Sequence, residues 1–267
     1  MPTSLSAIIT LLTDFGLQDY FVGAMKGVIL AINPSARIID ITHEIPPQDI
    51  EAGAFNLLAC YRDFPQGTIH VAVVDPGVGS TRRPILIASA NQFFIGPDNG
   101  IFSWICEREG KYKPIHLHNE KFFRQPVSST FHGRDIFAPV AGALSVGTPF
   151  DEFGTALADI IRLDSLEPKS LNANEIEARI IHIDRFGNCI TNLNRADLGV
   201  DFDGTKLRVG NHEITSFRNY FSEEAEQNDE IFCIVGSAGF VEIVAKNRSA
   251  AEILAAERGQ SAILVRS

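Results

Sequence analysis

The sequence predicts an α/β protein in which an N-terminal layered α/β domain is followed by a smaller, mainly antiparallel β domain. In the first half of the chain, short apolar runs alternate with longer amphipathic ones, as strands and helices do in an α/β layer. After residue 175 most apolar runs are short and strand-like. A polar stretch containing Pro168 separates the segments with these two patterns. We therefore expect an α/β domain over 1–163, a linker over 164–175 and a β domain over 176–267.

The elements of the N-terminal domain follow from apolar spacing and from the positions of proline. The first expected helix ends at Asn33, because Pro34 disfavours helical geometry in the residue before it. The last has helical spacing with an interruption expected at Pro139. Helices are expected at 20–33, 48–64 and 133–147, and strands at 7–12, 37–41, 68–75, 84–89 and 92–97.

The C-terminal domain is expected to consist of short strands with one helix among them. Gly210-Asn211 is a plausible two-residue hairpin turn. The helix has Ser249 and Glu252 at capping-box spacing and Gly259 near its end. Strands are expected at 178–184, 188–193, 206–210, 212–215, 230–235, 240–245 and 262–266.

Composition limits the partners that the chain can have. The 267 residues include 23 Lys and Arg against 33 Asp and Glu, so the net charge of −10 is opposite in sign to that of a typical phosphate-backbone binder. No apolar run approaches the roughly 18 residues of a membrane span, and the N-terminus lacks the features of a signal peptide. We expect a cytoplasmic protein without nucleic-acid or membrane partners.

The four cysteines lie in largely apolar segments and form no C-x-x-C pair. This spacing favours buried, reduced thiols over disulfides or zinc ligands. The residues are Cys60, Cys106, Cys189 and Cys233.

Common cofactor and nucleophile motifs are absent from the sequence. The glycines of VVDPGVGSTRR put Arg82 where a dinucleotide fingerprint needs its third glycine, and there is no P-loop. No H-E-x-x-H motif occurs, and His116 with His118 is typical of a half-exposed strand rather than a metal site. A G-x-S-x-G nucleophile elbow is also missing. We therefore predict neither a bound cofactor nor a metal.

Polar residues at strand ends are the remaining candidates for chemistry, because open α/β sheets bind ligands at the carboxyl ends of their strands. Asp14, Asp75 and Asp98-Asn99 each follow an apolar run and precede a glycine within two residues. A single carboxylate there can be a turn former or helix cap. Three such carboxylates, each beside a glycine that lets a ligand approach the backbone, favour a binding site.

Other candidates lie in nearby turns. Arg82 could fold back onto Asp75, although a surface ion pair is an equal alternative. His132 precedes a helix start, where it could titrate near neutrality or simply cap and pack. In the β domain Asp184, Phe186 and Asn188 share one turn, which could stack on and bond a purine or be a hairpin with incidental polar residues.

Seven segments together resemble the S-adenosylmethionine (SAM) hydrolases, also called SAM hydroxide adenosyltransferases, which are the hydroxide-using relatives of fluorinating and chlorinating enzymes. The matches span nearly the whole chain in consistent order. They are TDFG (13–16), ITHEIPPQDIEAGAFNL (41–57), VVDPGVGSTRRP (73–84), GPDNG (96–100), TFHGRDIFAPVAG (130–142), DRFGNCITN (184–192) and GSAGFVEI (236–243).

The resemblance implies a β-barrel-like C-terminal domain and a homotrimer whose active sites lie between neighbouring subunits. It implies a catalytic set of Asp75, Arg82 and His132. It further implies that Asp14 holds the ribose hydroxyls, that Asp184 and Ser237 hold the methionine end, that Asn188 holds the adenine, and that Phe186 and Tyr220 flank the base. Halogenating relatives have an arginine after this serine, whereas this chain has Ala238.

The implied reaction converts SAM and water to adenosine and L-methionine by in-line attack on C5′, with SAM as substrate and no cofactor. Two alternatives remain at this stage. One is a SAM-dependent halide transferase, which the hydroxide-branch residues and the lack of room for the halogenating branch's extra loop weigh against. The other is a sensor that binds SAM or adenosine without catalysis, which shares the same motifs.

Overall fold

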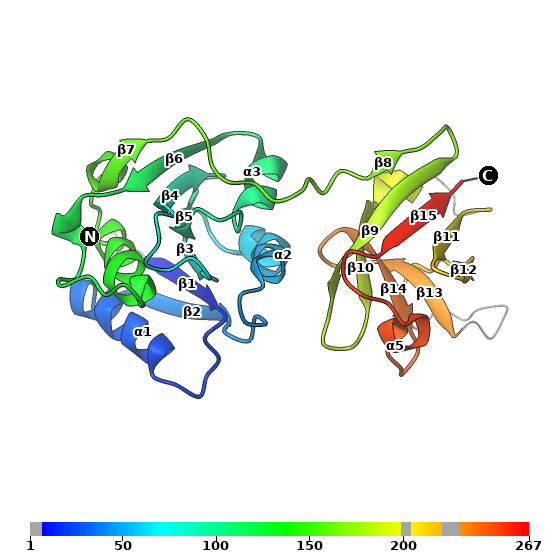
Figure 1. The fold of residues 1–267 in the computed structure, drawn as a ribbon, viewed down its shortest axis with the longest axis horizontal. Helices are drawn as coiled ribbons and strands as arrows, with labels where there is room; N and C mark the ends of the chain where they lie inside the picture. Colours follow the sequence, from blue (N-terminus) through cyan, green and yellow to red (C-terminus); the bar gives the residue numbers. More distant parts are fainter. Residues whose placement is uncertain (1–6, 199–203, 221–229, 267) are drawn as a thin grey trace, which may run out of the picture. The chain divides into compact units, whose positions relative to one another are not determined.

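The computed structural model describes residues 7–198, 204–220 and 230–266. Internal contacts divide the chain into two units between Ser165 and Leu166, an α/β domain and a β domain (Figure 1). The predicted fold class is confirmed. Inside the expected linker, strand β8 (Lys169–Ser170) pairs with β9 (Glu175–Ile183), so part of that segment belongs to the β sheet.

The α/β domain contains a seven-stranded sheet in the order β2-β1-β3-β5-β4-β6-β7. The first four strands in this order are parallel, and β4, β6 and β7 are antiparallel to their neighbours. Every residue of β3 is buried, as expected for a strand covered on both faces. The bounds are β1 Ile8–Thr13, β2 Arg37–Thr42, β3 Ile69–Val73, β4 Pro84–Ser89, β5 Gln92–Pro97, β6 Tyr112–Leu117 and β7 Gly154–Ala156.

Helices cover both faces of this sheet. Figure 1 shows α1 (Phe21–Ile32) on one side, with α2 (Ile50–Cys60) and α3 (Ser103–Glu109) on the other. Buried side chains of α1 and of α4 (Ala138–Ser145) share one core cluster with β1 and β3. The short helices are η1 Tyr61–Asp63, η2 Glu120–Phe122, η3 Gly133–Phe137, η4 Phe150–Phe153 and η5 Arg195–Leu198.

Pro139 does not interrupt a continuous helix over 133–147, so that expectation was wrong. A π-helical turn, η3, comes first, and α4 begins behind it with Pro139 in its first turn. Proline is tolerated there because the first N–H groups of a helix have no intrahelical acceptor.

The β domain is an eight-stranded antiparallel sheet in the order β12-β11-β15-β9-β10-β14-β13, with β8 beside β9. The segment after β12 returns to β13, where the Cys233 N–H donates to Ser216 O at 2.8 Å and the Arg218 N–H donates to Cys233 O at 2.8 Å. These bonds nearly close the sheet into the expected barrel. The remaining bounds are β10 Cys189–Asn194, β11 Lys206–Val209, β12 His212–Ile214, β13 Ile231–Val235, β14 Phe240–Ala245 and β15 Ser261–Val265.

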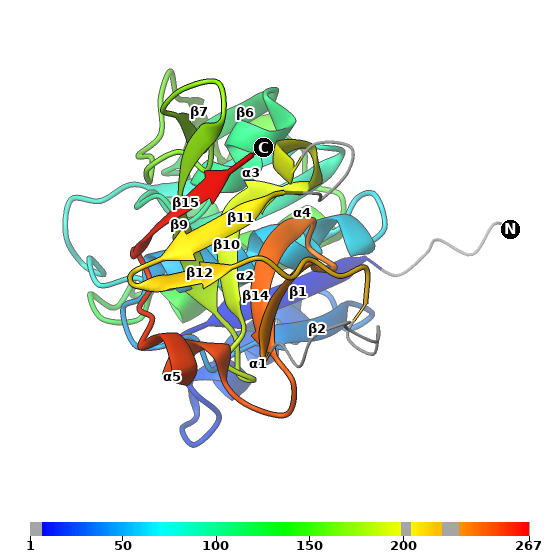
Figure 2. The same cartoon turned by 90° about the vertical axis from the view of Figure 1, so that its right-hand side faces the viewer.

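Two predicted features of the β domain are confirmed. Gly210 has φ +56° in the turn between β11 and β12. Ser249 Oγ accepts the Glu252 N–H at 3.1 Å and caps α5 (Ala250–Leu254), which lies at one end of the sheet (Figure 2). The helix is shorter than expected, since it ends at Leu254. Gly259 instead lies in the turn before β15, where its N–H donates to Ile180 O.

All four cysteines are unpaired, as expected, and three of them are buried, whereas Cys60 is half-buried. In the three described ranges, no helix has both the length and the apolar character to cross a bilayer.

Candidate active site

An ion pair between the buried side chains of Asp75 and Arg82 lies at the end of the parallel strands. Asp75 follows β3, and the side chains of Asp75 and Arg82 are 5% and 8% exposed. Arg82 Nε donates to both carboxylate oxygens at 2.9 Å, and Nη2 donates to Oδ2 as well. This buried, forked pair differs from the surface pair that spacing alone allowed.

His132 completes this group. Its Nδ1 lies 2.7 Å from Arg82 Nη2. A guanidinium has no acceptor, so Nδ1 must accept this bond, and the proton of a neutral imidazole is on Nε2. Burial lowers the pKa of His132, the Arg82 charge lowers it further, and Asp75 and Asp135 act against them. The imidazole is therefore more weakly basic than a solvated histidine.

One guanidinium nitrogen of Arg82 makes no hydrogen bond to the described residues. This nitrogen, Nη1, is buried. The guanidinium carbon also lies 5.4 Å from the centre of the Phe137 ring. An unpaired buried donor costs about 1–3 kcal/mol, and more when it is charged, so Nη1 is a strong potential donor to a ligand oxygen.

Close backbone contact holds the Asp75–Arg82 loop against the segment that carries His132. Gly79 has φ +77°, and a Cβ there would be 2.2 Å from the Ser129 carbonyl oxygen. At Gly77 a Cβ would crowd the Arg82 side chain at 3.3 Å. Glycine is required at position 79 both by its φ and by this approach.

Asp135 also holds the segment that carries His132 in place. Its carboxylate is fully buried and accepts bonds from Arg134 at 2.7 and 2.9 Å and from the Ser128 N–H at 2.9 Å. Burial acts to raise the pKa of Asp135, but these bonds and the positive charge of Arg134 hold it below its usual value. Asp135 was not predicted as a site residue from the sequence, although it follows His132 in the HGRD segment.

Asp14 lies on the neighbouring strand end. It follows Thr13, which pairs with Val73 two residues before Asp75, and it accepts the Gln48 N–H at 2.8 Å. Buried His43 supports this loop, because its Nδ1 lies 2.8 Å from Thr13 Oγ1 and its carbonyl accepts the Gly16 N–H. His43 is a second residue that the sequence analysis missed.

The third predicted strand-end pair has a structural role. Asp98 is 1% exposed, accepts from Arg83 Nε at 2.8 Å and holds the Ile161 N–H at 2.8 Å. Asn99 donates to the Val74 carbonyl at 2.7 Å. Both side chains therefore have structural partners: Asp98 links the end of β5 to Arg83 and Ile161, and Asn99 links it to the end of β3.

In the β domain, Asp184 organises the turn between β9 and β10. Oδ1 accepts the N–H groups of Phe186 and Asn188 at 2.8 and 2.9 Å, and Oδ2 accepts from Asn188 Nδ2 at 2.8 Å. The turn abuts the start of α5, since a Cβ at Gly187 would be 2.1 Å from Ser249 Oγ. Asp184 and Asn188 thus form one rigid polar unit.

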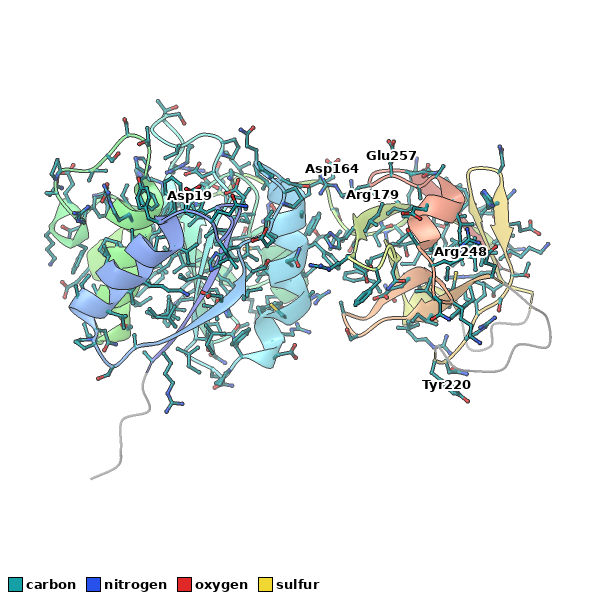
Figure 3. The ribbon with its side chains drawn as sticks, turned by 90° about the horizontal axis from the view of Figure 1, so that it is seen from below. Asp19, Asp164, Arg179, Tyr220, Arg248 and Glu257 are labelled. Atoms are coloured by element: carbon teal, nitrogen blue, oxygen red, sulfur yellow. The ribbon has the colours of Figure 1, made fainter. Side chains whose placement is uncertain are left out.

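The other predicted residues of this domain lie at its surface. Phe186 is 77% exposed at the tip of the Asp184 turn, and Tyr220 is 58% exposed (Figure 3). Ser237 is exposed in the turn between β13 and β14. No contact joins these three side chains to one another in the described structure.

Metal ligation has no support in the described parts of the chain, where no three His, Cys, Asp or Glu side chains are grouped to hold an ion. His116 and His118 lie on or beside β6, half-exposed and exposed, which confirms the strand interpretation.

The fold and the site define a two-domain protein with an Asp–Arg–His group, in which the Asp75–Arg82 pair is buried and His132 is half-buried, at the carboxyl end of the parallel strands of a mixed sheet. A family model for the SAM hydroxide adenosyltransferase N-terminal domain matches residues 9–154, and the model for the C-terminal domain matches 178–263. The chain therefore belongs to the SAM hydroxide adenosyltransferase family, as the sequence motifs indicated.

Individual relatives agree with this assignment. The (R)-S-adenosyl-L-methionine hydrolase of Methanocaldococcus jannaschii is 39% identical over 88% of this chain and 87% of its own. The hydrolase of Thermus thermophilus is 34% identical over 93% and 95%. A crystal structure of an uncharacterized conserved protein from Thermotoga maritima has a TM-score of 0.88 at 36% identity and covers 97% of this chain and 100% of its own. A fluorinase of an Actinoplanes species is less similar, at 29% identity over 78% and 80%.

Proposed function

We propose that this protein hydrolyses SAM to adenosine and L-methionine by attack of a water-derived hydroxide on C5′. The observation that carries the proposal is the group formed by the buried Asp75–Arg82 pair and half-buried His132, in which Arg82 Nη1 has no partner among the described residues. The hydrolase names of relatives that align with most of this chain support the same reaction.

The difficult part of this reaction is to activate and position the nucleophile, because the leaving group needs no help. As the oxygen–C5′ bond forms, the C5′–sulfur bond breaks and its electron pair stays on sulfur, so methionine leaves as a neutral thioether without a general acid. The water proton is released to solvent. Holding the oxygen in line about 3 Å from C5′ can contribute roughly 7–11 kcal/mol to lowering the barrier. We propose that no cofactor is needed.

The geometry suggests how the nucleophile is held. Arg82 Nη1 and His132 Nε2–H are donors, and a hydroxide between them would receive two hydrogen bonds in a largely buried environment. Because His132 Nδ1 accepts from Arg82 and Nε2 carries the proton, a neutral His132 in this arrangement has no vacant nitrogen for a general base. We assign His132 the role of donor, and Asp75 the role of fixing Arg82.

The substrate-binding roles are proposed from the family resemblance. Asp14 would hold the ribose, Asn188 the adenine, and Asp184 with Ser237 the methionine end, with Phe186 and Tyr220 beside the base. Phe186 and Tyr220 are exposed, which agrees with a role in stacking on the adenine of a bound ligand.

We also propose a homotrimer in which the β domain of one subunit completes the site of the next. Support comes from the distribution of the residues, because Asp14, Asp75, Arg82 and His132 belong to one unit and the remaining candidates to the other. The four unpaired cysteines support a reducing, cytoplasmic location.

Incubation with SAM in oxygen-18 water, with and without chloride or fluoride, tests the reaction. We expect adenosine labelled at its 5′-hydroxyl and unlabelled methionine. A 5′-halogenated nucleoside would show halide transfer instead, and binding of SAM without any product would show a sensor. Label in methionine would rule out attack at C5′.

A further inference from the structure

His43 is a buried histidine beside the strand end that carries Asp14. Its side chain is 2% exposed. Nδ1 lies 2.8 Å from Thr13 Oγ1, and Nε2 lies 3.1 Å from Asp40 Oδ1. Lys26 Nζ on α1 donates to the other carboxylate oxygen of Asp40 at 2.6 Å. A row of polar side chains therefore runs from α1 through the end of β2 to the last residue of β1.

A register shift between β1 and β2 brings Asp40 and His43 together. In a regular strand, residues three apart point to opposite faces of the sheet. Here Leu11 pairs with Asp40 but Leu12 pairs with Thr42, so β2 has one extra residue at this point. Such a bulge redirects the side chains that follow it. The extra residue thus lets the side chains of Asp40 and His43 approach one another.

The neutral tautomer of His43 with its proton on Nε2 suits every neighbour. Burial acts to raise the pKa of Asp40, but Lys26 and His43 hold it below its usual value, so this carboxylate is an acceptor only. Nε2 faces the carboxylate at ion-pair distance rather than in a linear hydrogen bond. Nδ1 is then free to accept from the Thr13 hydroxyl, whose oxygen in turn accepts the Phe15 N–H at 3.2 Å.

These contacts hold the backbone on both sides of Asp14. Thr13 precedes Asp14 and Phe15 follows it, and Thr13 Oγ1 joins the two. One residue further, the Gly16 N–H donates to the His43 carbonyl at 2.8 Å. The carboxylate of Asp14 accepts a backbone N–H through Oδ2, and its Oδ1 has no hydrogen bond among the described residues. Asp14 is therefore an acceptor held in place with one oxygen available to a ligand.

We propose that His43 is a positioning residue for the ribose of the ligand, acting through Thr13 on Asp14. This inference rests on the proposed function, in which Asp14 holds the ribose hydroxyls. His43 is buried and acts on the ligand only through this loop. A carboxylate whose backbone is already fixed loses less conformational entropy when it accepts the hydroxyl groups, so it binds them more tightly.

Binding of adenosine and of 2′,3′-dideoxyadenosine, which lacks both ribose hydroxyls, tests this role. The ratio of their dissociation constants measures recognition of the hydroxyl groups, and the reaction consumes neither ligand. Thr13→Val removes the hydroxyl that joins His43 to the loop, and His43→Gln places its amide too far out to accept from Thr13. We expect each to weaken binding of adenosine about 3- to 10-fold, the effect of about one hydrogen bond, and to leave binding of dideoxyadenosine unchanged.

Thr10→Val is the matched control. Thr10 also lies on β1, is fully buried, and has its Oγ1 2.8 Å from Nδ1 of buried His70. The substitution removes the same kind of bond from a histidine away from Asp14, so the wild-type ratio should remain. His43→Asn should also keep the ratio, because the asparagine oxygen falls near the position of Nδ1 and can accept from Thr13.

A wild-type ratio in Thr13→Val and His43→Gln, or an equal change in Thr10→Val, would overturn the role of His43. Asp14→Ala separates this inference from the ribose assignment, because it should abolish recognition of the hydroxyls. If it does not, the assignment of Asp14 is wrong and the role of His43 falls with it. These dissociation constants do not depend on turnover, so a wild-type protein that binds adenosine but forms none from SAM would refute the proposed reaction alone. Failure to bind adenosine would overturn both.

Discussion

At the scale of single residues, Arg82 is where the largest effect on the reaction is expected. Its Nε and Nη2 are occupied by Asp75 and His132, and Nη1 remains for the nucleophile. Lysine keeps the positive charge but cannot donate in these three directions. We expect Arg82→Lys to lower kcat about 100- to 1000-fold, as loss of a preorganised donor to an oxyanion does, with little change in KM.

Arg83→Lys is the control for this experiment. Arg83 is adjacent in sequence but pairs with Asp98 and Asp159, away from the His132 contact. Single-turnover kinetics at saturating SAM should show a rate close to wild type for Arg83→Lys. A normal rate in Arg82→Lys would contradict the role given to Nη1.

The pH dependence of turnover should report the protonation of His132. Protonated His132 cannot accept from Arg82 and would repel it. Its pKa is lowered by burial and by Arg82, so the neutral form persists below the ordinary histidine value of about 6.5. Activity should therefore fall with decreasing pH only below that value.

A profile of kcat against pH checks this assignment. In His132→Gln the overall rate should be lower and the acid limb that His132 causes should be absent. An acid limb above pH 6.5, or one that survives in His132→Gln, would assign the titration to another group.

At the scale of elements, the docking of the Asp75–Arg82 loop on the His132 segment depends on Gly79. Gly79→Ala adds the strain of a positive φ and a clash with Ser129 O. Gly67→Ala provides the comparison, because Gly67 has φ +83° but nothing within 4 Å of the added Cβ. The strain of a positive φ alone should lower the free energy of unfolding of Gly67→Ala by about 1 kcal/mol. In Gly79→Ala the decrease should be larger.

Activity separates these two variants further. Gly67→Ala should keep wild-type kcat, whereas Gly79→Ala should lose most of it, because the loop can no longer bring Arg82 to His132. Urea denaturation and initial rates measure both quantities. Equal effects of the two substitutions would show that the contact with Ser129 does not position the site.

Most strands and long helices were predictable, because their apolar periodicity is set by burial of one or two faces. The α3 helix and β7 were missed, since they have seven and three residues and little room for a periodic pattern. The expectation at Pro139 failed because apolar spacing does not distinguish a proline inside a helix from one in its first turn.

The site was predictable in part for a similar reason. Strand ends pointed to Asp14 and Asp75, but the same signal included Asp98, which pairs with Arg83 and holds the Ile161 N–H. Its structural role depends on partners distant in sequence.

At the scale of the whole molecule, the division of candidate residues between two domains makes assembly part of the proposed function. If each site combines the α/β domain of one subunit with the β domain of the next in a closed ring, two differently inactivated chains can restore one another. Asp75→Ala removes the partner of Arg82 in the first domain. Asp184→Ala removes the acceptor that orders the turn in the second.

Refolding an equal mixture of Asp75→Ala and Asp184→Ala after joint denaturation tests this arrangement. In randomly mixed rings about a quarter of the sites would combine an intact α/β domain with an intact β domain, so about a quarter of the wild-type activity should return. Each variant refolded alone should stay inactive, and light scattering should give the mass of three subunits. If labelled subunits have demonstrably mixed and no activity returns, each site is built within one chain, and the interface assignment is wrong even if SAM hydrolysis is right.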